Sequence, residues 1–70
     1  MSVIFRIEVE REEDGRWLAE VVELPGVLAY GTTDDEAIAR VQALALRVVA
    51  DRLENDKADK AFLEISFKAA

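Results

Sequence analysis

The chain has 70 residues and a mass of 7.8 kDa, which allow a single small domain spanning residues 1–70. Hydrophobic residues make up 51% of the sequence and charged residues 34%, a balance typical of a globular chain. The absence of histidine and cysteine excludes disulfide bonds, the usual zinc sites, thiol nucleophiles and histidine general bases. Any catalysis would depend on carboxylates, and we expect no cofactor.

Acidic residues are concentrated in the first half of the chain, and the formal net charge is −6. Residues 1–36 contain ten acidic and three basic residues, whereas residues 37–70 contain five acidic and six basic residues. Because phosphate backbones attract basic surfaces, we do not expect direct binding of nucleic acid. A basic protein partner would be steered toward the first half. The sequence shows no membrane span and no signal peptide, so we expect a cytoplasmic protein.

Three strands are predicted in the first half of the chain. Residues 3–10 alternate apolar and polar side chains with period two, which is typical of a half-buried strand. Asp14-Gly15 then predicts a hairpin, because glycine accepts the positive φ of a tight turn. A second strand is predicted over residues 17–23, and it ends at Leu24-Pro25-Gly26, where proline interrupts the ladder. A short third strand is expected over residues 27–30.

A long amphipathic helix is predicted from Asp34 to Leu53 or Glu54. Thr33 and Glu36 fit a capping box, in which the Thr33 hydroxyl accepts from the Glu36 amide and the Glu36 carboxylate reaches back. The stripe expected to face the sheet contains Ile38, Val41, Ala45, Val48 and Arg52.

The helix also carries a second, partly apolar row. Its members are Ala39, Gln42, Leu46, Val49 and Leu53. A helix that is apolar around most of its circumference is usually buried on two sides. We therefore expect a homo-oligomer, with a dimer favoured and with Leu46, Val49 and Leu53 at the interface. The alternative is that the alanine in this row merely favours helix formation.

The end of the chain completes the fold prediction. A polar connection over residues 55–60 precedes a fourth alternating segment over residues 61–68. The element order β-β-β-α-β predicts an α+β fold with two layers. In it, a three-stranded antiparallel meander and a fourth strand form a sheet that is covered on one face by the long helix.

Carboxylates are the only candidates for catalysis in this sequence. Pairs of them on strands could hold Mg²⁺ for phosphodiester hydrolysis. However, alternating glutamates normally mark the solvated face of a strand, and the acids at residues 34–36 are explained by helix capping. We therefore predict no enzymatic activity, no catalytic residue and no metal site. Trp17 is expected in the core, whereas Tyr30 fits either the core or a binding surface.

The ordered motifs of the chain resemble those of the HicB antitoxin family. The resemblance spans residues 3–68 and consists of an acidic-glycine hairpin followed by an aromatic residue and alanine, then Leu-Pro-Gly, a later glycine, and Thr-x-x-Glu-Ala at the start of an amphipathic helix. The matching segments are Asp14-Gly15-Arg16-Trp17-Leu18-Ala19, Leu24-Pro25-Gly26 and Gly31-Thr32-Thr33-Asp34-Asp35-Glu36-Ala37. Val27 stands where many family members have cysteine, a small change because buried cysteine behaves as a small hydrophobe.

This resemblance implies a partly degraded RNase H-like fold with a non-catalytic role. It also implies a toxin-antitoxin system, in which the domain neutralises a small basic mRNA-cleaving toxin of the HicA type by covering its active surface. Family members usually carry a further DNA-binding domain. Because this sequence stops at Ala70, we expect no direct contact with operator DNA.

Exposure and charge indicate which residues contact the partner. The predicted contacts are Glu20, Glu23 and Tyr30, with steering by the acidic turn residues Glu12, Glu13 and Asp14. Two alternatives stay open. One is an orphan oligomeric binding or regulatory domain without a toxin. The other is a metal-dependent RNase H-like nuclease, which requires at least two carboxylates to converge on metal ions.

Overall fold

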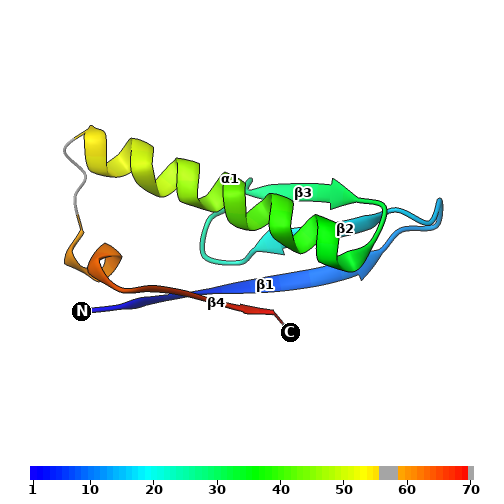
Figure 1. Ribbon diagram of the computed structural model, residues 1–70, viewed down its shortest axis with the longest axis horizontal. Helices are drawn as coiled ribbons and strands as arrows, with labels where there is room; N and C mark the ends of the chain where they lie inside the picture. Colours follow the sequence, from blue (N-terminus) through cyan, green and yellow to red (C-terminus); the bar gives the residue numbers. More distant parts are fainter. Residues whose placement is uncertain (56–58, 70) are drawn as a thin grey trace.

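The computed structural model of the protein describes residues 1–55 and 59–69. Its elements are β1 (Val3–Arg11), β2 (Trp17–Val21), β3 (Leu28–Gly31), α1 (Asp34–Glu54), a short 3₁₀ helix η1 (Lys60–Leu63) and β4 (Ile65–Ala69). The four strands form one mixed sheet in the order β3-β2-β1-β4, and α1 packs against one face of this sheet (Figure 1). The predicted α+β class and the order β-β-β-α-β are therefore confirmed.

Strand β1 joins the two halves of the sheet. It pairs antiparallel with β2, with Glu8 opposite Glu20, and parallel with β4 on its other side. Strand β2 pairs antiparallel with β3, with Leu18 opposite Tyr30. Strands β3 and β4 are consequently the two edges, and α1 connects one edge to the other (Figure 1).

The core lies between α1 and the inner face of the sheet. Its buried residues on the strands and the loop after β2 are Phe5, Ile7, Ala19, Val21, Leu24 and Val27. Its buried residues on the helix recur every four positions and are Ala37, Val41, Ala45 and Val49. Alanines at these positions allow the helix to approach the sheet closely. Trp17, which was predicted in the core, is half-buried and packs against this cluster.

The stripe of α1 that faces the sheet differs from the predicted one. Ile38 and Val48 are only partly buried and flank the stripe, and Arg52 is exposed with its charge in solvent. Val49, which was predicted at an oligomer interface, is 3% exposed and belongs to the core of the chain itself. The predicted interface role of Val49 is corrected accordingly, because its side chain is already covered.

Helix α1 begins directly against the end of β3. A Cβ atom at Gly31 would lie 2.5 Å from the Ala37 amide nitrogen, so this position requires glycine. The Thr33 hydroxyl accepts from the Glu36 amide at 3.1 Å, which confirms the predicted N-cap. The Glu36 carboxylate accepts from the Thr32 amide at 3.1 Å, one residue earlier than a standard capping box predicts.

Strands β1 and β3 match their predicted ranges to within one residue, whereas β2 and β4 differ more from the prediction. Strand β2 ends at Val21 because the chain turns immediately afterwards, where the Val27 amide donates to the Leu24 carbonyl at 3.0 Å and Gly26 adopts a φ of +87°. Strand β4 begins at Ile65 because η1 precedes it. The polar connection predicted over residues 55–60 lies partly outside the described residues, and Lys60 begins η1.

The domain is elongated along α1 and β1 (Figure 1). Its principal extents are 40 × 21 × 16 Å, and its radius of gyration is 12.7 Å. A compact domain of 70 residues would have a radius of gyration of about 11 Å. The buried residues of α1 end at Val49, and the following five residues of the helix are all exposed.

Candidate partner-binding face

The face of the sheet that points away from α1, which we call the outer face, carries acidic and apolar side chains over β1, β2 and β3, and the cations Arg6 and Lys68 where β1 meets β4. Two rows of residues cross the sheet from β1 to β3 through β2. One row is Glu10, Leu18 and Tyr30, and the other is Glu8, Glu20 and Leu28. Each row therefore runs from a carboxylate on β1 to an apolar side chain on the edge strand β3.

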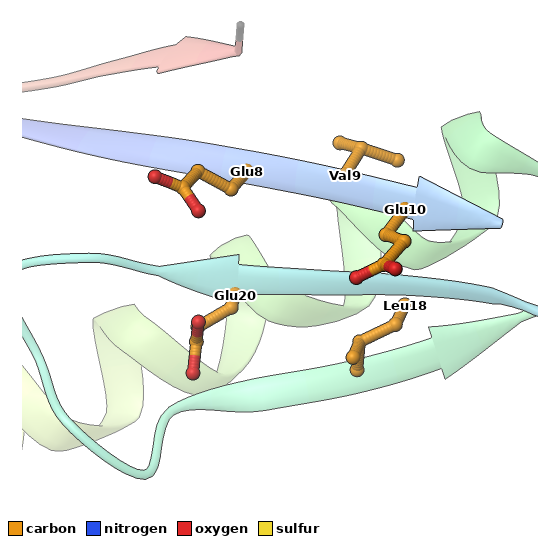
Figure 2. Close-up of a pocket in the computed structure, with 5 residues that line it drawn as sticks. All are labelled: Glu8, Val9, Glu10, Leu18 and Glu20. Atoms are coloured by element: carbon orange, nitrogen blue, oxygen red, sulfur yellow. The ribbon is translucent and has the colours of Figure 1, made fainter. Parts of the chain in front are cut away.

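Three carboxylates of the outer face lie around a shallow hollow (Figure 2). Glu8, Glu10 and Glu20 line it together with Leu18 and Val9, and its volume is about 260 Å³. In the part of the chain that the structure describes, none of the three carboxylates takes part in an ion pair. Glu8 and Glu20 are directly opposite each other, and like charges in this position repel. The hollow therefore favours a cation supplied from outside the chain.

Glu23, a predicted partner contact, is paired within the chain. Its carboxylate accepts from the Arg6 amide at 2.8 Å and from Arg6 Nε at 2.6 Å. Hydrogen bonding by the Arg6 side chain, followed by the backbone bond, lowers the pKa of Glu23. Because Arg6 balances its charge, Glu23 offers less to a basic partner than Glu20 does.

Arg16 links the hairpin between β1 and β2 to the outer face. The Asp14 carboxylate accepts from the Arg16 amide at 3.0 Å and from Arg16 Nε at 2.7 Å. The backbone hydrogen bond from Arg16, together with its side-chain bond, lowers the pKa of Asp14. The Arg16 guanidinium lies 4.3 Å from the centre of the Tyr30 ring. This stack places Tyr30 on the surface rather than in the core.

The acidic hairpin residues lie beside the first hollow rather than inside it. Glu12 and Glu13 line a wider depression with Glu10 and the Asp14–Arg16 pair. Arg16 balances Asp14, whereas Glu13 is exposed. Their position is consistent with long-range steering and not with a buried contact.

The structure brings two predicted site residues, Glu20 and Tyr30, onto one face. The sequence interpretation missed the grouping of Glu20 with Glu8 and Glu10. A signal for it existed, because strand alternation puts Glu8 and Glu10 on one side, and a hairpin about Asp14 brings Glu20 opposite Glu8.

The surface predicted for self-association lies on the other side of the molecule. Leu46 is 48% exposed and Leu53 is 44% exposed, both on α1. Because Val49 lies in the core, Leu46 and Leu53 are the two predicted interface residues that a second chain could contact.

Among residues 1–55 and 59–69, no group of three or more acidic side chains is arranged to hold a metal ion. Within the same ranges, α1 is too polar to be a candidate membrane span. Comparison with protein-family models, curated proteins and solved structures finds no match to this chain.

Proposed function

We propose that this protein is a HicB-like antitoxin module that binds and neutralises a small basic mRNA-cleaving toxin in the cytoplasm. The observation that carries the proposal is the set of carboxylates on the outer face, Glu8, Glu10 and Glu20, none of which forms an ion pair among the described residues. The ordered motifs that resemble the HicB family support the same role.

The chemistry of the proposed partner fits this face. A protein that cleaves mRNA needs a cationic surface, because its substrate is a chain of phosphates. Carboxylates spaced across neighbouring strands offer that surface an alternative set of anions. Covering the surface requires no catalytic group on the antitoxin, so inhibition follows from binding alone.

An interface needs apolar contacts as well as charges, and the outer face provides them through Leu18, Leu28 and Tyr30. Leu28 is 39% exposed and Tyr30 is 37% exposed, both on β3. Leu18 lies between Tyr30 and Glu10, and Leu28 is directly opposite Glu20. Aromatic side chains with a polar end are common anchors at protein interfaces. We propose Tyr30 as the anchor and the three glutamates as the groups that select a basic partner.

Repulsion within the face contributes to the binding. Glu8 and Glu20 are forced together by the pairing of β1 and β2. A lysine or arginine placed between them relieves this repulsion, and it interacts less with Glu23 or Asp14, whose charges Arg6 and Arg16 already balance. The association should therefore weaken as salt increases.

The test is a pull-down with the tagged full chain from a lysate of its source organism, at low and moderate salt. The expected product is a small basic protein whose RNA cleavage is inhibited when the purified chain is added back. Recovery of the chain alone, or of a protein without RNA-cleaving activity, would contradict the proposal and favour an orphan binding domain.

A pair of variants then locates the contact. Glu20→Lys should weaken binding of the recovered protein at least about tenfold, corresponding to about 1.4 kcal/mol. Glu54→Lys makes the same change of net charge on α1, away from the outer face, and should retain most of the affinity. Equal loss in both variants, or none in Glu20→Lys, would show that the outer face is not the contact.

A further inference from the structure

The outward side of α1 carries a regular apolar row, which we call the outer seam. Its members are Ala39, Ala43, Leu46, Ala50 and Leu53, and all five are exposed. Their spacing of four, three, four and three residues averages 3.5. This is the repeat with which one helix packs along another.

The outer seam is distinct from the stripe that α1 uses for its own core. The core stripe contains Ala37, Val41, Ala45 and Val49, and none of these belongs to the seam. Leu46 and Leu53 remain 48% and 44% exposed. A helix with apolar residues on two sides has a second partner to cover the free side.

We propose that a second copy of this chain covers the outer seam, with the two α1 helices antiparallel. In the register that places Leu46 opposite the partner's Ala50, Ala43 lies opposite the partner's Leu53. By symmetry, each of the four layers then pairs one alanine with one leucine. Large side chains facing small ones give layers of equal width, which favours close packing along the contact. A parallel pair would instead alternate Ala–Ala and Leu–Leu layers.

Charges on one flank of the seam select the same arrangement. Along α1 this flank carries two cations followed by two anions, and its members are Arg40, Arg47, Asp51 and Glu54. An antiparallel copy reverses the order, so that Arg47 faces the partner's Asp51, whereas Arg40 is bonded within its own chain to the Tyr30 carbonyl and to Glu36. Within the described residues, Arg47 and Glu54 take part in no ion pair. Both are free to pair across the interface.

The balance of charge explains why a second copy, and not the basic partner, occupies the seam. The flank is complementary to itself through Arg47 and Asp51, whereas the carboxylates Glu8, Glu10 and Glu20 on the outer face of the sheet would repel those of a second copy. Because the seam and the outer face lie on opposite sides of the domain, the dimer leaves both outer faces open.

The first test measures the mass of the purified full chain by sedimentation equilibrium up to about 1 mM, where a millimolar Kd is detectable. We expect a reversible transition from 7.8 kDa to twice that mass. The double variant Leu46→Glu/Leu53→Glu should weaken dimerisation at least about a hundredfold. Leu28→Glu is the matched control, because Leu28 is 39% exposed on the sheet, and it should dimerise normally. Circular dichroism verifies that each variant is folded.

A wild-type chain that stays monomeric throughout, or a folded double variant that still dimerises normally, would overturn the proposal. The test uses this chain alone, so its outcome is independent of the proposed toxin partner.

Disulfide trapping tests the orientation, because the chain contains no cysteine of its own. In the antiparallel pair, the two copies of residue 43 are separated by about 15 Å along the helices, too far for a disulfide. Ala43→Cys alone should therefore remain uncrosslinked, whereas a mixture of Ala43→Cys and Leu53→Cys should form the mixed disulfide. Efficient crosslinking of Ala43→Cys to itself would indicate a parallel pair and overturn the proposed arrangement.

Discussion

The outer face of the sheet and the outer seam of α1 expose apolar side chains to a similar extent, but the charges around them differ. Leu28 and Tyr30 on the sheet are 39% and 37% exposed, and Leu46 and Leu53 on the helix are 48% and 44% exposed. The sheet residues border carboxylates without ion pairs among the described residues, whereas the helix residues border a flank that carries both cations and anions.

This difference teaches that exposed apolar residues show where a chain can associate, whereas the charges around them determine which kind of partner binds there. An acidic border repels a second copy of the same chain and attracts a basic protein. A border with cations at one end and anions at the other is complementary to its own reversed copy. One small domain can thus carry two interfaces that exclude each other's partners.

The largest expected effect comes from Gly31→Ala, which disturbs both surfaces together. The new Cβ would meet the Ala37 amide nitrogen at 2.5 Å and force α1 away from β3. We expect a loss of about 3 kcal/mol in the free energy of unfolding, measured by urea denaturation.

Gly15→Ala is the control for Gly31→Ala. Nothing lies within 4 Å of a Cβ atom at Gly15, and only its φ of +89° is unfavourable for alanine. The cost there should be about 1 kcal/mol. An equal cost at the two positions would show that the contact between β3 and α1 is not tight.

A smaller effect is expected from Thr33→Ala, which acts on the helix and leaves the sheet pairing intact. The variant removes the acceptor for the Glu36 amide, and we expect a loss of about 1 kcal/mol of unfolding free energy. Thr32→Ala should cost less, because the Thr32 hydroxyl makes only a 3.3 Å contact with the Glu36 carboxylate. Thermal denaturation compares the two variants, and the reverse order would contradict the assigned cap.

The smallest expected effect is a dependence of the unfolding free energy on pH. It comes from two ion pairs beside the sheet and does not involve α1. The pKa values of Glu23 and Asp14 are lowered in the folded chain by bonds to Arg6 and Arg16. The folded state therefore binds protons at these groups less readily than the unfolded state does. Their contribution to stability is present above the ordinary pKa values of 4.5 and 3.8, and it is lost as the pH falls through the lowered ones.

Urea denaturation at a series of pH values from 7 to 2 measures this contribution. Glu23→Gln and Asp14→Asn should each reduce the loss of stability on acidification, whereas Glu13→Gln should leave it unchanged. Because both ion pairs are exposed, 1 M salt should reduce the effect further. If both variants lost as much unfolding free energy on acidification as the wild-type chain, the assigned ion pairs would be contradicted.

Local patterns in the sequence predicted most of the fold, because the forces behind them act over a few residues. Strand alternation, the Asp14-Gly15 turn and the Thr33 cap each depend on near neighbours, and all three are present in the structure. The pairing of Arg6 with Glu23 spans 17 residues and depends on the turn that ends β2 early. No local pattern of charge indicates it.

The interface residues of α1 show a second limit of sequence interpretation. The row that includes Gln42 and Val49 and the row that includes Ala43 and Ala50 both average 3.5 residues per step. Periodicity alone does not distinguish them, because they differ only by a rotation about the helix axis. The packing of α1 on the sheet decides the rotation, and it buries Val49 and leaves Ala43 and Ala50 exposed.

The hydrogen bond from Arg40 to β3 has a consequence for the integrity of the sheet. Arg40 Nη1 donates to the Tyr30 carbonyl at 2.9 Å, and Nη2 lies 3.2 Å from the Glu36 carboxylate. Edge strands with vacant backbone groups invite pairing with strands of other molecules. Here the Arg40 side chain of α1 donates to one carbonyl of β3, an edge strand of four residues. This bond occupies an acceptor that an added strand would otherwise use, so it disfavours strand addition at this point of β3.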